Sequence, residues 1–315
     1  MYTPPFTISA KAIHLIAEIS AQIERYAIRM EQEDALLLRK VNRIKSIHSS
    51  LAIEGNNLTE DEVIDILDGK TVIAPLREIQ EVKNAIKTYN AYASLNPYSV
   101  DDLLRAHRLM MEALTDDAGR FRRGGVGVYA GSQLLHIAPP ADRVPYLVKD
   151  LIDWLKGSED HLLIKSCVFH YEFEFIHPFS DGNGRTGRLW QSLILGRLHP
   201  LFEHLPIENM VYANQQAYYD AIERSSDKGD SGVFIDFMLA EILNALKSRQ
   251  GKVLPDDTVN DTVKCIKTNP KITLDELAMR LGKSRSTVAR IIRQLREKGI
   301  IRRVGSDKAG YWEVT

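Results

Sequence analysis

The chain has 315 residues, of which 44% are hydrophobic and 26% are charged. This composition is typical of a globular protein and excludes a disordered, collagen-like or coiled-coil chain, and the length predicts two or three domains. No uncharged apolar run approaches the roughly 18 residues that a membrane helix needs, and the N-terminus lacks a signal-peptide pattern, so we expect a cytoplasmic protein with no membrane partner.

The formal net charge of −1 hides an asymmetry between two parts of the chain. Residues 256–315 carry a net charge of +5 and the remainder carries −6. A basic segment of this kind suggests an acidic partner, most often nucleic acid. The two cysteines, Cys167 and Cys265, lie far apart and in different predicted domains, which argues against a disulfide framework or a cysteine zinc site.

Helical spacing of apolar residues dominates the chain up to about residue 250. The segments with this spacing are 10–30, 58–67, 79–92, 101–114 and 141–155, and a further helix is expected from about residue 34 to near residue 54. Thr59 begins a capping box, and Ser99 precedes two aspartates in a first helical turn, so both mark helix starts.

Residues 126–137 break the helical pattern, because β-forming residues alternate there around Gly131 and Ser132. This predicts a short β-hairpin. Helices are then expected over 160–175 and 186–198, on either side of a polar glycine-rich loop, and near 214–224 and 233–247. Residues 251–257 form a predicted linker.

The basic tail has the spacing of a helix-turn-helix, with helices over 273–281 and 285–298 and a terminal hairpin that resembles the wing of a winged helix. Arg285, Arg290 and Arg293 lie on the second helix and are expected to contact double-stranded DNA. The alternative is a domain used for dimerisation or target docking, with these charges simply solvated.

The loop between the helices 160–175 and 186–198 concentrates chemical groups in twelve residues, His177-Pro-Phe-Ser-Asp181-Gly182-Asn183-Gly184-Arg185-Thr186-Gly187-Arg188. Gly182, Asn183 and Gly184 all tolerate positive φ, so the backbone N–H groups can turn inward and bind an anion. A helix N-terminus follows directly, and this favours phosphate.

Side chains of the same loop suggest a phosphate-transfer site. Arg185 and Arg188 are spaced to lie on one helix face and to bind phosphate oxygens. Asp181 is a hard oxygen ligand suited to Mg²⁺. His177 suits proton abstraction from an attacking hydroxyl.

Three other interpretations of this loop stay open. Residues 182–187 also match a dinucleotide-binding fingerprint, but a predicted helix rather than a strand precedes them. His170, Glu174 and His177 share a helical spacing that allows a metal site, although not the spacing of a zincin helix. The third interpretation is an ordinary glycine loop with a hydrogen-bonded histidine and solvated arginines.

The loop resembles, at every defining position, the Fic family signature His-x-Phe-x-Asp/Glu-Gly-Asn-Gly-Arg-x-x-Arg. The resemblance implies that His177 is a general base, that Asp181 holds Mg²⁺, and that ATP is bound by residues 182–188. The implied reaction transfers AMP from ATP to a Ser, Thr or Tyr hydroxyl of a target protein. The intact Gly182 and Gly184 favour AMP transfer over the phosphorylation catalysed by Doc-like relatives, and the motif does not distinguish it from phosphocholine transfer.

The resemblance extends to other parts of the chain. Hairpin 126–137 occupies the place of the family's flap, which is thought to pair with an extended target segment, although an ordinary structural hairpin is the alternative. Tyr218 and Tyr219 lie on the helix that flanks the adenine in relatives, and core packing is the alternative for both. Some relatives dimerise, so a homodimer is also allowed.

The segment Ser50-Leu-Ala-Ile-Glu54-Gly55 fits the family's inhibitory pattern Ser/Thr-x-x-x-Glu-Gly/Asn. By this resemblance, a Glu54 carboxylate paired with Arg188 occupies the guanidinium that would bind the γ-phosphate of ATP. Removing Glu54 is therefore expected to activate the protein. In relatives the same glutamate is also linked to removal of AMP from modified targets.

These observations predict a mostly α-helical protein with a Fic fold, a short β-hairpin flap and a C-terminal winged helix-turn-helix. The expected domains are an N-terminal helical region with the inhibitory helix (1–95), a Fic catalytic domain (96–250) and the winged domain (256–315). The expected function is a self-inhibited protein adenylyltransferase. The alternative is a DNA-binding transcriptional regulator whose Fic module acts as a nucleotide-responsive or self-modifying switch.

Overall fold

The computed structural model describes residues 2–32, 35–130, 133–203, 205–248, 257–297, 300–305 and 310–314. The chain divides into two compact units, residues 1–247 and residues 248–315. The predicted linker lies outside the described residues except for Asp257, and the division of the first unit at residue 95 stays a prediction. No helix in these ranges is long and apolar enough to cross a membrane.

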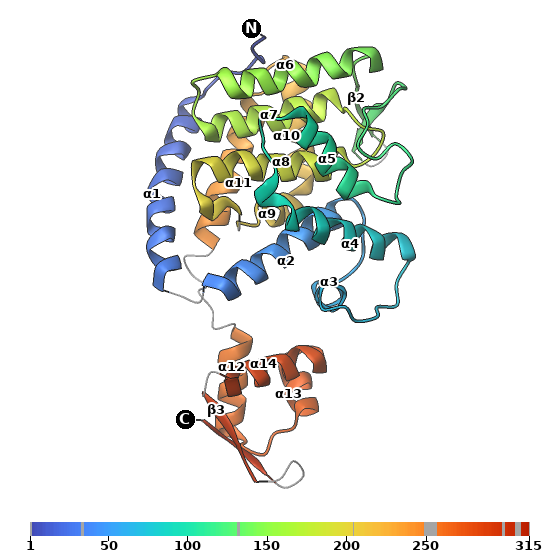
Figure 1. The fold of residues 1–315 in the computed structure, drawn as a ribbon. Helices are drawn as coiled ribbons and strands as arrows, with labels where there is room; N and C mark the ends of the chain where they lie inside the picture. The colour runs from blue at the N-terminus through green and yellow to red at the C-terminus, as the bar shows by residue number, and fades with distance from the viewer. Residues whose placement is uncertain are drawn as a thin grey trace. The chain divides into compact units, whose positions relative to one another are not determined.

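The first unit is mostly helical, as the spacing of apolar residues predicts (Figure 1). Its helices are α1 (Ala10–Gln32), α2 (Ala35–Ile53), α3 (Glu60–Leu67), α4 (Leu76–Asn90), α5 (Val100–Met111), α6 (Val144–Gly157), α7 (Leu162–Ile176), α8 (Asn183–Leu198), α9 (Ile207–Ala213), α10 (Gln215–Lys228) and α11 (Gly232–Ser248). Short 3₁₀ turns lie at Tyr92–Ser94, Ala141–Arg143 and Pro200–Glu203.

Helix α7 lies between α6 and α8 and is buried on nearly every side (Figure 1). Its Phe169 and Phe173 have no exposed surface, and Trp190 of the neighbouring α8 is equally buried. A helix that is buried on nearly every side has no solvent-facing polar stripe, which explains why the segment lacks an amphipathic pattern. The helices α2, α5 and α6 contact this central pair, so the loop that joins α7 to α8 is held from several sides.

Local signals in the sequence set several helix starts. The capping box predicted at Thr59 is confirmed, because its hydroxyl accepts from the Glu62 N–H while the Glu62 carboxylate accepts from the Thr59 N–H. Ser99 caps α5 through the N–H of Asp102. Caps of this kind satisfy N–H groups that a first helical turn leaves without a helical partner.

The predicted hairpin is also confirmed. Strands β1 (Gly127–Ala130) and β2 (Gln133–Ile137) pair antiparallel, with an irregularity between Val128 and Tyr129. The Gly131-Ser132 turn lies outside the described residues.

The start of α8 differs from the sequence-based expectation. The helix begins at Asn183 rather than Thr186, so Asn183 and Gly184 are helical, and only Gly182 of the three has positive φ. The Asn183 side chain explains the early start, because its amide bonds both the N–H and the carbonyl of Phe179. The loop therefore has one left-handed glycine, where the sequence allowed three consecutive left-handed residues.

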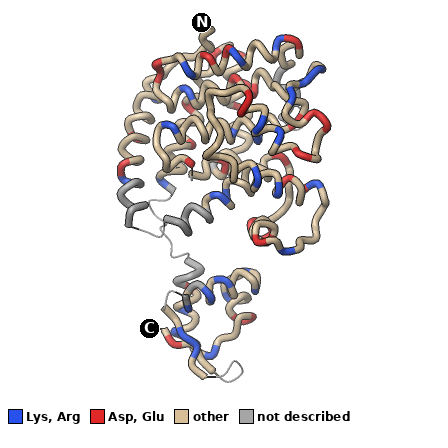
Figure 2. Tube along the Cα trace, in the orientation of Figure 1, with Lys and Arg blue, Asp and Glu red and all other residues tan. Residues whose placement is uncertain are grey.

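The second unit has its own small core and the predicted winged helix-turn-helix arrangement. It contains α12 (Asp257–Thr268), α13 (Leu274–Leu281), α14 (Arg285–Glu297) and the antiparallel strands β3 (Ile301–Val304) and β4 (Tyr311–Val314). Its buried residues are Ile266, Ile272, Leu277, Val288, Ile291, Ile292, Leu295 and Ile301. Basic residues recur along α14 and β3 (Figure 2).

Candidate active site

His177 ends helix α7 in an unusual backbone conformation. Its φ of 50° and ψ of 62° are left-handed, which is strained for a residue other than glycine. The ring Nδ1 lies 3.3 Å from the Glu174 carbonyl oxygen. A carbonyl can only accept, so Nδ1 carries a proton, and Nε2 is the nitrogen that could accept one.

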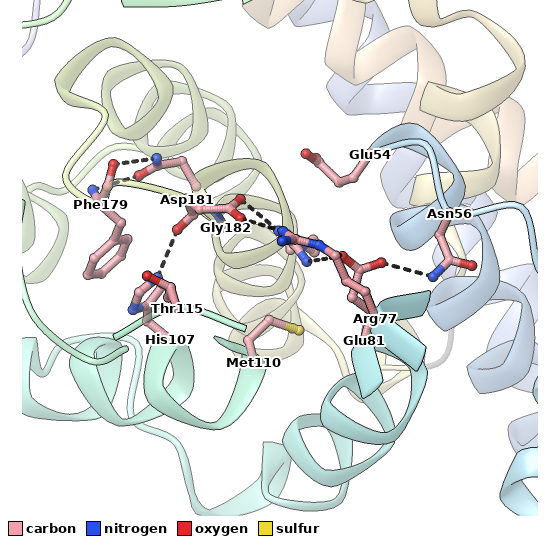
Figure 3. A network of polar contacts seen from close by, with 12 residues as sticks. Glu54, Asn56, Arg77, Glu81, His107, Met110, Thr115, Phe179, Asp181 and Gly182 are labelled. Atoms are coloured by element: carbon pink, nitrogen blue, oxygen red, sulfur yellow. Dashed lines mark hydrogen bonds and ion pairs between the residues drawn. The ribbon is translucent and has the colours of Figure 1, made fainter. Parts of the chain in front are cut away.

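Asp181 is held by two arginines from different helices (Figure 3). Its Oδ1 lies 2.8 Å from the Arg185 guanidinium, and its Oδ2 lies 3.1 Å from the Arg77 guanidinium. Glu81 lies behind both arginines, 3.4 Å from Arg77 and 3.6 Å from Arg185. Asn56 donates to the other Glu81 oxygen at 2.9 Å, which connects this cluster to the segment just after α2.

The donor set fits a Mg²⁺ ion that bridges phosphates. Such an ion needs only one or two carboxylates, because phosphates and waters complete its shell. Asp181 supplies one half-exposed carboxylate, and the described residues contain no cluster of three or more metal-ligating side chains. A cation bound at Oδ2 would compete with the Arg77 guanidinium for the charge of that carboxylate.

Arg188 is almost fully buried and is paired with the segment that resembles the inhibitory pattern. Its side chain is 3% exposed, and its Nη2 lies 2.7 Å from Glu54 Oε1 and 2.8 Å from the Ser50 carbonyl oxygen. Its Nε donates to the Ser50 hydroxyl at 3.2 Å. Burial alone would lower the pKa of Arg188, but the Glu54 charge raises it above its ordinary value.

Two glycines of α8, Gly184 and Gly187, leave room for the carboxylates of Glu54 and Glu174. A Cβ on Gly184 would lie 2.4 Å from Glu54 Oε1, and a Cβ on Gly187 would lie 2.7 Å from Glu174 Oε1. Gly184 therefore admits the Glu54 carboxylate rather than a left-handed turn. Burial raises the pKa of Glu174 to about 8.

Three buried donor atoms of Arg185 and Thr186, at the start of α8, make no hydrogen bond within the protein. Arg185 Nε and Thr186 Oγ1 are buried and make no hydrogen bond, and the buried Arg185 Nη1 has only the 3.6 Å ion pair with Glu81. Cationic and hydroxyl donors of this kind suit an anionic oxygen ligand. Arg185 and Arg188, predicted to share a task, are turned toward different carboxylates, Asp181 and Glu54.

Tyr218 and Tyr219 occupy different environments. Tyr218 is buried, and its hydroxyl lies 2.8 Å from His170 Nε2, whose ring also bonds Gln191. Burial lowers the pKa of His170 to about 3, so this ring is neutral. Tyr219 is half-buried and accepts from Gln215, which also donates to the Ile53 carbonyl at the end of α2.

His107 fixes the backbone of the loop, and nothing in the sequence singled it out. Its Nδ1 accepts from the Gly119 N–H at 2.8 Å, and its Nε2 donates to the Asp181 carbonyl at 2.9 Å. The ring is stacked on Phe179 with centroids 3.6 Å apart. Burial lowers the pKa of His107 to about 4, so the ring is neutral and its tautomer is set by these two bonds.

The predicted DNA-contacting side chains lie on α14. Arg285 and Arg293 are exposed and Arg290 is half-buried. Arg285 lies 3.1 Å from Asp275 of α13.

Two family models match the chain. Residues 97–195 match the Fic/DOC family, and residues 256–302 match a winged helix-turn-helix DNA-binding family. The first match spans the hairpin and the 177–188 loop, and the second spans α13 and α14.

Curated relatives include two proteins named Protein adenylyltransferase fic-1. The Caenorhabditis elegans protein is 30% identical over 66% of this chain and 42% of its own length, and the Caenorhabditis briggsae protein is 29% identical over 72% of this chain and 46% of its own length. The chain thus spans less than half the length of these relatives.

Solved structures match over more of the chain. A Fic family protein from Desulfovibrio desulfuricans G20 is 42% identical, with a TM-score of 0.78 over 100% of this chain and 98% of that one. Residues 134–508 of C. elegans Fic-1 share the fold, with a TM-score of 0.61 at 21% identity over 77% of this chain and 72% of that one. Taken with the geometry of the 177–188 loop, these matches show that the chain belongs to the Fic family.

Proposed function

We propose that the chain is a protein adenylyltransferase that transfers AMP from ATP to a Ser, Thr or Tyr hydroxyl of a target protein. The observation that carries the proposal is the 177–188 loop, where a histidine, a carboxylate and two buried arginines lie within one short segment. The names of the curated relatives favour the same reaction.

In this proposal His177 Nε2 accepts the proton of the target hydroxyl while the hydroxyl oxygen attacks the α-phosphorus of ATP. The bond to the pyrophosphate leaving group breaks as the new phosphoester bond forms. The hydrogen bond from Nδ1 to the Glu174 carbonyl stabilises the positive charge that the ring acquires.

The triphosphate is assigned to the start of α8. The N–H groups of the first turn of α8, Arg185 Nε, Thr186 Oγ1 and the Arg188 guanidinium would bind its oxygens. Asp181 would hold Mg²⁺, which when bound neutralises charge on the phosphates. Tyr219 is the residue of the tyrosine pair that we assign to the adenine, because Tyr218 is buried in the core.

We also propose that Glu54 inhibits the protein. Its carboxylate occupies the Arg188 guanidinium at 2.7 Å, and Ser50 bonds the same side chain. Arg188 is 3% exposed whereas Glu54 is 31% exposed, so Glu54 can move into water but Arg188 cannot. A triphosphate that reaches Arg188 must therefore displace Glu54.

The test is incubation of the purified chain with Mg²⁺ and ATP labelled at the α-phosphate, with label on protein as the measurement. Glu54→Gly is expected to label itself or lysate proteins strongly, the unaltered chain weakly, and Glu54→Gly with His177→Ala not at all. Equal labelling by the parent and the Glu54 variant contradicts the inhibition. Loss of all transfer in every variant contradicts the adenylyltransferase assignment.

A second candidate function rests on the winged helix-turn-helix unit, whose own core and exposed arginines suit DNA binding. In that case the chain is a transcriptional regulator and the Fic module is its nucleotide-responsive switch. Deleting residues 256–315 is expected to leave label transfer intact under the first function. Under the second, the full chain binds a DNA duplex and ATP changes that affinity.

A further inference from the structure

Arg122 lies just before the hairpin and is buried without a carboxylate partner among the contacts of its guanidinium. The side chain is 3% exposed. Each of its nitrogens donates to a backbone carbonyl: Nε to His177 at 2.7 Å, Nη1 to Gly124 at 2.7 Å, and Nη2 to both Pro139 and Ile176. Its backbone N–H also donates to the Pro178 carbonyl at 3.0 Å.

The four carbonyls that accept from the guanidinium come from two separate parts of the site. The carbonyls of Ile176 and His177 belong to the end of α7, beside the proposed base. Gly124 and Pro139 stand at the two ends of the hairpin, just before β1 and just after β2. A guanidinium is planar and its donors have fixed directions, so one side chain sets the position of one part relative to the other.

Both the end of α7 and the hairpin need contacts from outside themselves to hold their conformation. A left-handed conformation at a residue such as His177 persists only where the surroundings hold it, and Arg122 binds the carbonyl that this conformation presents. A two-stranded hairpin is marginally stable by itself, and one further backbone bond, from the Ala138 N–H to the Val126 carbonyl, closes its base.

We propose that Arg122 is a positioning residue that couples the hairpin to the catalytic histidine. This inference rests on the proposed function, in which His177 takes the proton of the target hydroxyl, and on the target-presenting role that the family resemblance implies for the hairpin. The distance from that hydroxyl to His177 Nε2 then depends on the Arg122 guanidinium, whose acceptors are all backbone carbonyls of the protein itself.

The first experiment measures amide hydrogen exchange without nucleotide, so that it does not depend on transfer activity. Arg122→Lys keeps the charge but cannot donate in four directions from a planar fork. Arg123→Lys is the matched control, because Arg123 is the exposed next residue. Exchange in Arg122→Lys is expected to rise roughly tenfold in residues 124–139 and 174–179 together, and to stay unchanged in α3 and α11.

Other exchange patterns overturn the proposal. Faster exchange in only one of the two segments means that Arg122 does not couple them. A uniform rise that includes α3 and α11 means that Arg122 only stabilises the unit as a whole.

The second experiment measures label transfer in a Glu54→Gly background. Arg122→Lys is expected to lower the rate at saturating ATP by about 100-fold, because small displacements of reacting groups have effects of that size, and to change the KM for ATP by less than about twofold. Guanidinium ion added to Arg122→Ala is expected to restore part of the rate.

Label transfer and hydrogen exchange together distinguish failure of the proposed function from failure of the role proposed for Arg122. A Glu54→Gly parent that transfers no label contradicts the proposed function, and hydrogen exchange still decides the role of Arg122. A parent that transfers label, with an Arg122→Lys variant as fast as Arg123→Lys, contradicts the positioning role alone.

Discussion

Arg185 and Arg188 of α8 differ from Arg285 of α14 in their contact with water. Arg185 and Arg188 in the first unit are each 3% exposed and face Asp181 and Glu54. In the second unit, the paired Arg285 is 68% exposed. A buried guanidinium without an anion carries a large desolvation cost, whereas an exposed one is solvated with or without a partner.

This difference explains how the two units can respond to anions. Arg188 is paired with Glu54, so under the proposed function a phosphate that reaches Arg188 replaces one anion with another. The exposed arginines of α14 can bind or release a phosphate with little effect on the stability of the second unit. Control by competition therefore suits the first unit, and salt-sensitive binding suits the second.

The largest expected effect comes from altering the buried arginine while keeping its charge. In a Glu54→Gly background, Arg188→Lys is expected to lower label transfer by about 100-fold, because an ammonium cannot reproduce the planar donors of a guanidinium toward phosphate. Arg197→Lys, on an exposed face of the same helix, is the control. Equal rates for the two variants would mean that buried and exposed arginines of α8 are equivalent.

A second prediction concerns His107, a buried basic residue that is neutral at pH 7. His107 has a pKa of about 4 in the folded chain, below the ordinary value of 6.5, so the unfolded chain takes up the proton first as pH falls. Above pH 6.5 the ring is neutral in both states and the titration of His107 does not affect stability. As the pH falls from 6.5 toward 4, the free energy of unfolding decreases. Between pH 7.5 and pH 5 this group is expected to reduce the free energy of unfolding by roughly 2 kcal/mol.

Urea unfolding at the two pH values measures that loss. The pH dependence is expected to shrink by roughly 2 kcal/mol in His107→Gln. The exposed His14, which lies beside Glu18, supplies the control variant His14→Gln, expected to leave it unchanged. An undiminished pH dependence in His107→Gln would mean that other groups cause it.

Short-range patterns made much of the fold and of the candidate site predictable. The capping box at Thr59, the hairpin and the helix-turn-helix are each encoded within a few residues. The approach of Glu54 to Arg188 was expected from a family resemblance, since 134 residues separate them and no local pattern connects them.

Other parts of the site could not be predicted from one sequence. Arg77, Glu81, His107 and Arg122 are common residue types, and their contacts with the loop join positions 55 to 104 residues apart. The early start of α8 was missed for a related reason. Glycine and asparagine are poor helix formers, but the Asn183 side chain and the Asp181–Arg185 pair stabilise the first turn.

The third prediction tests a pair of intermediate exposure. Arg77 and Asp181 have side chains that are 60% and 40% exposed, so their ion pair is weak, about 0.2 to 1 kcal/mol. Arg77→Gln is expected to strengthen Mn²⁺ binding, with Mn²⁺ as a probe for Mg²⁺, by at most roughly fivefold. Titration followed by electron paramagnetic resonance measures the affinity. Arg105→Gln, which breaks the exposed pair with Asp102, is the control. Weaker Mn²⁺ binding in Arg77→Gln would show that Arg77 supports the metal site.

The smallest effect is expected for the exposed arginines of α14 and concerns their contribution to DNA binding. Arg293→Gln is expected to weaken binding to a mixed-sequence DNA duplex only a few-fold and to lower the slope of log K against log salt concentration by about 1. Arg285→Gln is expected to change that slope less, because Asp275 already offsets part of the Arg285 charge. Fluorescence anisotropy across a salt series measures both slopes. Equal slopes for Arg293→Gln, Arg285→Gln and the parent would mean that α14 does not contact phosphates, and the arginines of this unit would then serve only to keep its surface solvated.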